Sequence, residues 1–326
     1  MNKRQKNGKT KEIVLKALKR KRGKFVSGET LADEHGISRA AVWKAVKTLQ
    51  NNGYDIECRT RSGYMLTEHG GKLSEDGIKK YLFEDGIHIH VFDSVGSTND
   101  IVKSLGREGA PEWTVVAART QTGGRGRMGR TFESPNDDGI YMSILLRPTI
   151  SASEAVTITT YAAVAVCEAV ERFTGAECSI KWVNDVYMNS KKICGILTES
   201  DIDGADGTMN FAVLGIGLNV TDRNLSEEVK QIAGGLGLEH ESDIKNKIAA
   251  ALLTKLKILY ADLMSDRVFD KYRSRSFLIG KDVTFKQGDE TKCARVVELS
   301  RDYSLVVETD DGEKIALGSG EVSVKL

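Results

Sequence analysis

The stretch from Gln121 to Arg130 constrains the fold more than any other part of the chain, because it places four glycines and three arginines in ten residues. Glycine lets backbone amides approach a ligand and take positive φ angles, and arginine adds a planar fork of donors that matches carboxylate and phosphate oxygens. The stretch lacks the ending of a Walker A loop and the G-x-G-x-x-G spacing of a dinucleotide site. It suits a large anionic ligand, such as a nucleotide that releases pyrophosphate. A solvated turn or an RNA-binding tract would share its composition.

Charge is divided unevenly along the 326 residues. Residues 1–68 hold 16 Lys and Arg against 7 Asp and Glu, whereas the remaining 258 residues hold 31 against 39. The net charge of +1 therefore conceals a basic end of +9 on an acidic body of −8. This division favours a phosphate-binding module joined to a separate domain over a merely solvated basic tail, and the length fits two or three domains.

The composition predicts a cytoplasmic protein without a membrane span. Hydrophobic residues make up 40% of the chain, enough for a sizeable core. There is no run of about 18 apolar residues, and the charged N-terminus lacks the apolar core of a signal peptide. The five cysteines are scattered and contain no C-x-x-C pair, so we expect neither a disulfide framework nor a zinc site.

Helical spacing and cap residues indicate a helix-turn-helix near the N-terminus. We expect helices over 10–22, 28–35 and 39–50, with Ser27 before the second and Ser38 as the N-cap of the third. The third helix would bury one face, which carries Val42, Val46 and Leu49.

Residues 54–66 then predict a hairpin with a basic tip, as in the wing of a winged helix. The exposed face of the third helix and this tip would together contact DNA, although a solvated basic face is the plainer alternative. The expected DNA-binding residues are Ser38, Arg39, Trp43, Lys44, Lys47, Arg59 and Arg61.

The centre of the chain mixes strands and long helices, which indicates a mixed α/β domain. Strands are expected near 87–93, 114–119, 140–146, 179–188, 192–200 and 209–219, and helices near 98–107, 153–173 and 241–264. A short helix over 73–83 precedes them, and a helix and link over 268–280 follow. Short strands with turn residues between them, over 281–286, 292–299, 303–309, 313–318 and 321–325, then predict a small barrel.

Four segments of the central region carry candidate ligand-binding chemistry. Ser97-Thr98-Asn99 follows a strand and opens a helix, as a helix cap or as a ligand site. Gln121 can both donate and accept a hydrogen bond. Lys181 has apolar neighbours on an expected buried strand, where its charge is costly unless it pairs with an anion or reaches the sheet edge. Glycines at 195, 215 and 217 lie inside strands, which suggests a close ligand or neighbouring backbone.

Taken in order, these segments resemble the motifs of the biotin–protein ligases. The resemblance is carried by Ser97-Thr98-Asn99, the loop 124–130, Lys181-Trp182-Val183-Asn184-Asp185, Gly195-Ile196-Leu197 and Gly215-Ile216-Gly217-Leu218-Asn219. With the predicted winged helix in front, the chain resembles the bifunctional form, which is both biotin ligase and biotin operon repressor, from about residue 10 to the end.

The resemblance implies an α+β multidomain fold and two activities. It implies a winged helix-turn-helix over 1–69, a mixed α/β catalytic domain of the biotin/lipoate ligase type over 70–275, and an SH3-like β-barrel over 276–326. Biotin and ATP, with Mg²⁺, would give biotinyl-5′-AMP, from which biotin passes to a lysine of a biotin carboxyl carrier protein, such as that of acetyl-CoA carboxylase. The adenylate would also act as corepressor for a homodimer on operator DNA.

The resemblance also implies a set of site residues. Biotin would lie against Ser97, Thr98, Asn99, Gln121, Arg125, Gly126, Arg127, Lys181 and Gly195. The nucleotide would contact Arg125, Arg127, Arg130, Asn184 and Asn219. Because two anions must be brought together, fixed positive charge is needed where charge builds up, and we expect Lys181 and Arg127 to supply it. No dedicated metal ligands are expected, since phosphates would hold Mg²⁺ in part.

Two other functions remain open at this point. A lipoate–protein ligase-like enzyme would share the catalytic fold, but Gln121, the Gly/Arg loop and the N-terminal module favour biotin. A ligand-responsive repressor without ligase activity would release no pyrophosphate, and the Gly/Arg loop with Lys181 argues against it.

Overall fold

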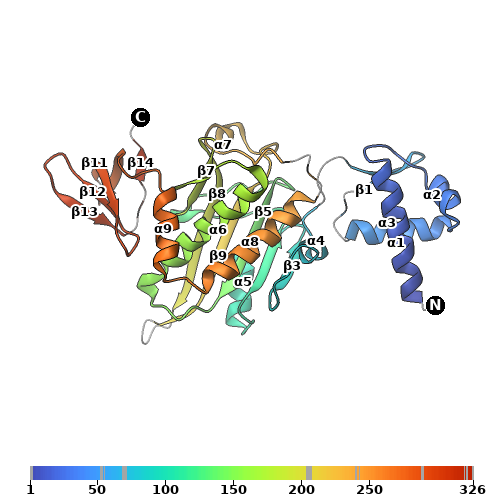
Figure 1. Cartoon of the computed structure of the whole chain (residues 1–326), viewed down its shortest axis with the longest axis horizontal. Helices are drawn as coiled ribbons and strands as arrows, with labels where there is room; N and C mark the ends of the chain where they lie inside the picture. Colours follow the sequence, from blue (N-terminus) through green and yellow to red (C-terminus); the bar gives the residue numbers. More distant parts are fainter. Residues whose placement is uncertain are drawn as a thin grey trace. The chain divides into compact units, whose positions relative to one another are not determined.

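The computed structural model describes residues 3–51, 54, 56–67, 72–202, 208–238, 241, 243–287, 290–318, 320 and 322–324. The chain forms two compact units (Figure 1). The first consists of residues 1–83 and 237–250, and the second consists of residues 84–236 and 251–326.

The first unit begins with three helices and a hairpin. Helices α1, α2 and α3 span Lys3–Arg20, Gly28–His35 and Arg39–Asn51, and strands β1 and β2 span Ile56–Arg59 and Gly63–Leu66. Ser27 caps α2 by accepting from the Thr30 amide at 2.9 Å, and Ser38 caps α3 by accepting from the Ala41 amide at 3.2 Å. The expected helix-turn-helix and hairpin are therefore confirmed.

The core of this module lies where the helical spacing predicts. Val42, Val46 and Leu49 of α3 are buried against apolar residues of α1, α2 and the hairpin. The hairpin also pairs with the chain before α2, through a bridge between Val26 and Tyr64. Gly63 has a φ of +100°, and a Cβ there would lie 2.1 Å from the Val26 carbonyl oxygen, so only glycine lets the two segments meet.

A polar clamp joins the short helix α4 (Glu75–Lys79) to the first turns of α8 (Ile244–Tyr260). The fully buried Asn246 accepts from the Ser74 amide and donates to the Lys72 carbonyl, each at 3.0 Å. Gly77 leaves room for this side chain, because a Cβ there would lie 2.5 Å from it. The helix expected over 73–83 is thus shorter. The domain boundary expected between residues 69 and 70 falls outside the described residues.

A seven-stranded mixed sheet organises the second unit. The strand order is β3-β4-β5-β9-β8-β7-β6, with β3 and β4 parallel and every other pair antiparallel. The strands span His88–Phe92 (β3), Thr114–Ala118 (β4), Gly139–Leu146 (β5), Ser179–Lys181 (β6), Asp185–Met188 (β7), Lys191–Ile202 (β8) and Met209–Asn219 (β9).

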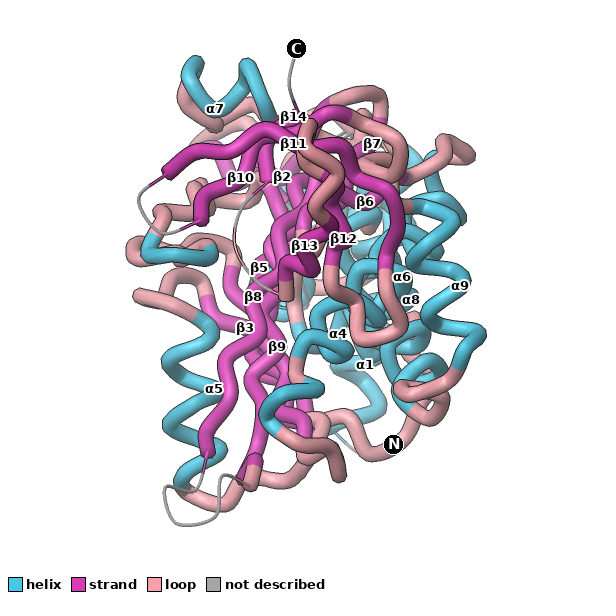
Figure 2. Tube along the Cα trace, turned by 90° about the vertical axis from the view of Figure 1, so that its left-hand side faces the viewer, coloured by secondary structure: helices cyan, strands magenta, loops and turns pink. Residues whose placement is uncertain are grey.

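Helices cover the sheet on both faces, as Figure 2 shows. On one side lies α5 (Thr98–Arg107), whose Val102 packs against Val116, Leu145 and Val213 of the sheet. On the other lie α6 (Val156–Thr174) and α9 (Asp266–Arg275). Within the described residues, 152–174 form the helical stretch long and apolar enough to cross a membrane, but 72% of its apolar window is buried, as in the core helix of a globular domain.

Two expectations for the central region need correction. The strand expected over 179–188 is two short strands, β6 and β7, joined by a turn, and β6 is the edge of the sheet rather than a buried strand. Lys181 therefore reaches water without needing a buried anion. A short helix α7 (Glu227–Ile232), capped by Ser226, was not expected.

The C-terminal strands form a separate antiparallel sheet of order β13-β12-β11-β10-β14. They span Asp282–Gln287 (β10), Glu290–Leu299 (β11), Leu305–Glu308 (β12), Lys314–Leu317 (β13) and Val322–Val324 (β14). The five expected strands are all present. Among the described residues no pairing between β13 and β14 closes the sheet into the expected barrel.

Candidate active site

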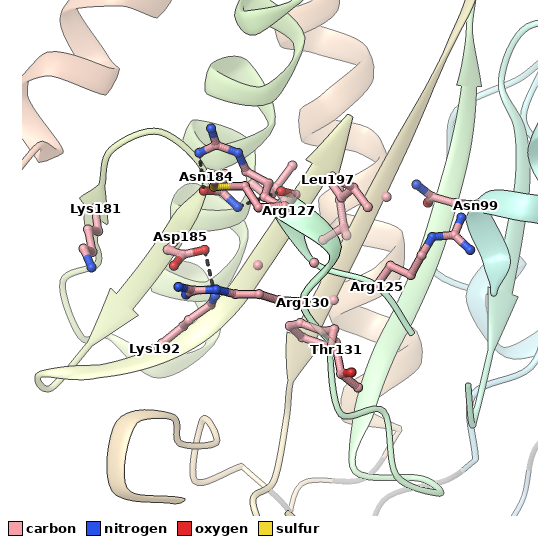
Figure 3. Close-up of a pocket in the computed structure, with 18 of the residues that line it drawn as sticks. Asn99, Arg125, Arg127, Arg130, Thr131, Lys181, Asn184, Asp185, Lys192 and Leu197 are labelled. Carbon is pink, nitrogen blue, oxygen red and sulfur yellow. Dashed lines mark hydrogen bonds and ion pairs between the residues drawn. The ribbon is translucent and has the colours of Figure 1, made fainter. Parts of the chain in front are cut away.

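The predicted site residues meet in one cavity of about 220 Å³ on the α5 side of the central sheet (Figure 3). Those that line it are Ser97, Thr98, Asn99, Gln121, Arg125, Gly126, Arg127, Arg130, Lys181, Asn184 and Gly195. Asn219, expected at the nucleotide, lies outside the lining. It is buried at the end of β9, and its Oδ1 has no hydrogen-bond partner among the described residues.

Part of the cavity floor is a row of residues that runs across strands β6, β7, β8 and β9. Lys181 pairs with Asp185, Asp185 with Gly195, Gly195 with Gly217, and Gly217 with Tyr141. Side chains that face each other across a sheet share one face, so the two glycines leave a gap between the side chains of Asp185 and Tyr141, and the ring of Phe132 covers this gap. This row lies two residues along the strands from the row that packs against Asn99, and therefore on the same face.

The strand glycines make room for side chains from distant segments, not for backbone. A Cβ at Gly217 would lie 2.5 Å from the ring of Phe132, and one at Gly195 would lie 3.1 Å from the same ring. A Cβ at Gly215 would lie 2.2 Å from Oδ1 of Asn99. Phe132 therefore forms part of the cavity wall. Phe132 was not among the expected site residues, although two glycines on neighbouring strands are a signal that something large covers them.

Gln121, and not Ser97, caps the N-terminus of α5 with its side chain. Ser97 holds the N-cap position without a side-chain cap bond. The Gln121 Oε1 instead accepts from the Thr98 amide at 2.9 Å and from the Thr98 hydroxyl at 3.1 Å, and its Nε2 donates to Ser134 at 2.9 Å. Ser97, Thr98 and Asn99 are all buried. The amide thus fixes the start of α5 against the strand that leads into the Gly/Arg loop.

The arginines of the loop point to opposite sides of the cavity. Arg125 is directed toward Asn99 (Figure 3). Its guanidinium donates to the Asp100 carboxylate. These hydrogen bonds hold the pKa of Asp100 below its ordinary value, against the opposing effect of burial. Arg127 donates to Asn184 Oδ1 at 3.2 Å and to the Gly320 carbonyl at 3.1 Å. Arg130 is exposed at the rim.

The C-terminal sheet forms part of the same wall. Gly320 and Val322 line the cavity, and the Trp182 indole donates to the Tyr303 carbonyl at 2.8 Å in a buried contact. Tyr272 of α9 donates to the Val183 carbonyl at 3.1 Å. The turn between β6 and β7 is thereby held from two elements that lie far away in the sequence.

Two lysines line the cavity, in different surroundings. Lys181 stands at the sheet edge, apart from the other labelled side chains in Figure 3. The Nζ of Lys192 lies 2.8 Å from Oδ1 of Asp185. The Cε of Lys192 would lie 3.4 Å from a Cβ at Gly195, so this side chain extends beside Gly195. Its side chain is 26% exposed. Sequence reasoning missed Lys192, although its place three residues before a strand glycine of the motif was a usable signal.

The expected DNA-binding residues all lie at the surface of the first unit. Ser38, Arg39, Trp43, Lys44, Lys47, Arg59 and Arg61 are exposed, and Trp43 keeps 56% of its surface, unusual for so large an apolar side chain. The guanidinium carbon of Arg59 lies 4.6 Å from the ring centre of Phe25, so this hairpin arginine packs over an aromatic ring from the segment before α2.

Comparison with known proteins agrees with this division of the chain. Residues 91–219 match the Biotin/lipoate A/B protein ligase family, and residues 11–65 match an HTH domain family. Residues 91–219, which supply most of the cavity lining, thus match the biotin and lipoate ligase class.

Relatives of nearly full length narrow this further. The chain is 34% identical to the bifunctional ligase/repressor BirA of Bacillus spizizenii, over 89% of this chain and 91% of that protein. It is 29% identical to the Escherichia coli protein of the same name, over 93% and 94%. A biotin protein ligase from Aquifex aeolicus, solved with biotin and ATP, covers 73% of this chain and 98% of its own, with 26% identity and a TM-score of 0.61. The chain belongs to the bifunctional ligase/repressor family, which confirms the recognition made from its motifs.

Proposed function

We propose that the protein is an ATP-dependent biotin–protein ligase and a repressor of genes for biotin synthesis or uptake. The observation that carries the proposal is the convergence of the Gly/Arg loop, the strand glycines and two lysines on one cavity. In the first half-reaction a biotin carboxylate oxygen attacks the α-phosphorus of ATP, the bond to the bridging oxygen breaks, and pyrophosphate leaves. In the second, a lysine amine of the acceptor attacks the mixed-anhydride carbonyl, AMP leaves, and the amine loses a proton.

The residues of the cavity would divide this work. Biotin would lie in the cavity beside Phe132, against Ser97, Thr98, Asn99, Gln121, Arg125, Gly126, Arg127, Lys181 and Gly195. The nucleotide would contact Arg125, Arg127, Arg130 and Asn184, and it would reach Asn219 beyond the lining, at the end of β9. Mg²⁺ would arrive on the phosphates of ATP, and Asp185 is the acidic side chain, among the described residues, that lines the cavity. The metal would neutralise phosphate charge.

Arg127 and a lysine would stabilise the charge that builds up when the two anions meet. The sequence assigns the lysine role to Lys181, and we propose that Lys192 takes the larger share. Lys192 extends beside Gly195, in the interior of the sheet, whereas Lys181 stands at the sheet edge. An anionic ligand would replace Asp185 as the partner of the Lys192 ammonium group.

Exchange of labelled pyrophosphate into ATP tests both the reaction and the lysines. We expect exchange with biotin, and none with lipoate or without an acid. Exchange driven by lipoate alone would overturn the choice of substrate, and no exchange with any acid would leave a repressor without ligase activity. Lys192→Met should lower kcat/KM by at least about 100-fold, the usual cost of losing one transition-state contact, and more than Lys181→Met does. A larger loss of kcat/KM in Lys181→Met than in Lys192→Met would mean that Lys181 has this role.

The winged helix-turn-helix would bind operator DNA as a homodimer, because two half-sites need two helices at a fixed separation. Biotinyl-5′-AMP as corepressor would favour the dimer by binding it more tightly than the monomer. Arg39→Ala and Lys47→Ala should each weaken operator binding and reduce the salt dependence by about one counterion, with pyrophosphate exchange unchanged. Gel-shift affinity that is independent of biotin and ATP would count against the corepressor role.

Three further features belong to the same proposal. The described C-terminal strands would close into an SH3-like barrel. The domains would span 1–69, 70–275 and 276–326. The protein would work in the cytoplasm, where its acceptor, the biotin carboxyl carrier protein of acetyl-CoA carboxylase, and its operator are both available.

A further inference from the structure

The outer face of α3 presents one large apolar side chain. Trp43 keeps 56% of its surface exposed, whereas Val42, Val46 and Leu49 of the same helix are buried in the core of the module. A single exposed apolar residue does not by itself mark a binding site. The side chains around Trp43 and its position on the helix therefore decide what it can contact.

The neighbours of Trp43 on this face favour an anionic partner. Arg39 and Lys47 lie one turn before and one turn after Trp43, at the spacing that places helix side chains next to each other. Lys44 follows directly, and all three cations are exposed. The 13 residues of α3 contain no acidic residue. Burying these charges against an apolar protein surface would be costly, whereas DNA supplies phosphates for them.

Trp43 also lies where a recognition helix reads bases. α3 is the second helix of the helix-turn-helix, and Ser38 caps its N-terminus. In this motif the N-terminal part of the second helix contacts base edges in the major groove. Trp43 is the fifth residue of α3, about 6 Å along the axis from Arg39. It therefore belongs to the part of the helix that enters the groove.

The chemistry of the indole matches one base. The indole offers an apolar ring and a single N–H donor, with no acceptor. In the major groove thymine presents a methyl group beside the O4 acceptor, whereas guanine presents two acceptors without a methyl group. Cytosine presents a donor, and adenine presents a donor beside its acceptor. Thymine is therefore the base whose edge fits both parts of the Trp43 side chain.

We propose that Trp43 determines sequence specificity by packing its indole against the 5-methyl group of one thymine in each operator half-site, while Arg39 and Lys47 beside it bind phosphates. The inference rests on the proposed repressor function and adds to it one residue and the base that this residue reads. Loss of a single methyl contact should weaken binding about fourfold, the factor that corresponds to the burial of one methyl-sized group.

Duplexes that the full-length protein selects from a random pool, with biotin and ATP present, supply the probe. Each thymine of the selected site is replaced in turn by deoxyuridine, which removes the 5-methyl group and keeps every hydrogen-bonding group. Gel shift then measures the affinity. We expect one thymine in each half-site at which the replacement weakens wild-type binding about fourfold. Equal affinity after replacement at every position would overturn the proposal.

The variant Trp43→Ala assigns the methyl effect to this side chain. It should bind the selected site at least about fivefold more weakly, the least that one misread base pair costs, and deoxyuridine at the sensitive position should have no further effect. Lys47→Ala is the matched control, one turn further along α3. It should also bind more weakly, but it should keep the methyl effect. A methyl effect that survives in Trp43→Ala, or that is lost in Lys47→Ala as well, would refute the assignment.

Further outcomes separate this inference from the repressor function. Because Trp43 is exposed and alanine favours a helix, Trp43→Ala should keep the circular dichroism spectrum and the urea midpoint of the wild type. Wild-type protein that selects no sequence would overturn the repressor function, and the inference with it. A selected site that Trp43→Ala binds as tightly as the wild type would overturn the inference alone. A variant that changes only the sedimentation mass would place Trp43 in a contact between copies of the chain instead.

Discussion

The contact between Gly215 and Asn99 allows one substitution to be worked out in detail. A Cβ at Gly215 would lie 2.2 Å from Oδ1 of Asn99, whereas ordinary contact begins at 3.4 Å, so the amide would have to move by about 1.2 Å. Oδ1 accepts from Ser143 at 2.6 Å, and Nδ2 donates to Glu199 at 2.7 Å. Gly215→Ala cannot keep both hydrogen bonds, because a shift of that size breaks their geometry.

The cost follows from these contacts. Crowding in a packed interior costs about 1–3 kcal/mol, and a hydrogen bond contributes about 1 kcal/mol, or more to a charged partner. We expect Gly215→Ala to lower the free energy of unfolding by about 2–4 kcal/mol. Because Glu199 also faces Arg125, the substitution should loosen the Gly/Arg loop and weaken the binding of biotin.

Urea unfolding followed by tryptophan fluorescence measures the first effect, and isothermal titration with biotin measures the second. Gly96→Ala is a suitable control, since a Cβ there meets nothing within 4 Å. If Gly215→Ala unfolds at the same urea concentration as Gly96→Ala, the close packing of Asn99 against β9 does not exist as described and the reasoning fails.

Three other substitutions test contacts away from the loop. Burial alone would raise the pKa of Glu168, but hydrogen bonds from lysines on α9 and α8 outweigh burial and hold the pKa below 4.5. Glu168→Gln should therefore lower the free energy of unfolding by about 1 kcal/mol at neutral pH. This stabilisation is present above pH 4.5 and is lost as the pH falls through the lowered pKa. A stability difference between the wild type and Glu168→Gln that grows on acidification would refute it. Trp182→Phe leaves the buried Tyr303 carbonyl unpaired and should cost about 1–3 kcal/mol, which an unchanged melting temperature would contradict. Asn246→Ala removes the acceptor of the Ser74 amide and should lower the free energy of unfolding by about 2 kcal/mol. Hydrogen exchange at the Ser74 amide measures the effect, and undiminished protection there would argue against the clamp.

Local chemistry could be predicted for much of the fold. Ser27, Ser38 and the spacing of Val42 and Val46 determine where helices start and which face they bury, because these effects act within a few residues. The residue pattern of each strand and the glycines and arginines of the loop are likewise local features of the chain. The winged helix-turn-helix, the mixed central region and the chemical types gathered at the site were therefore readable in order along the chain.

The tertiary structure decided which of those residues meet. Lys181 was expected on a buried strand, but its strand is the edge of the sheet, and Lys192 lies beside Gly195 instead. The spacing of residues along the chain does not encode the order of the strands in a sheet. Phe132 covers Gly217 from 85 residues away, and Arg125 meets an aspartate 25 residues away. Burial and charge pairing at such separations depend on the packed whole, so the sequence by itself determined the chemical groups and the local elements, and only the fold decided which cations line the cavity and which carboxylate pairs with Arg125.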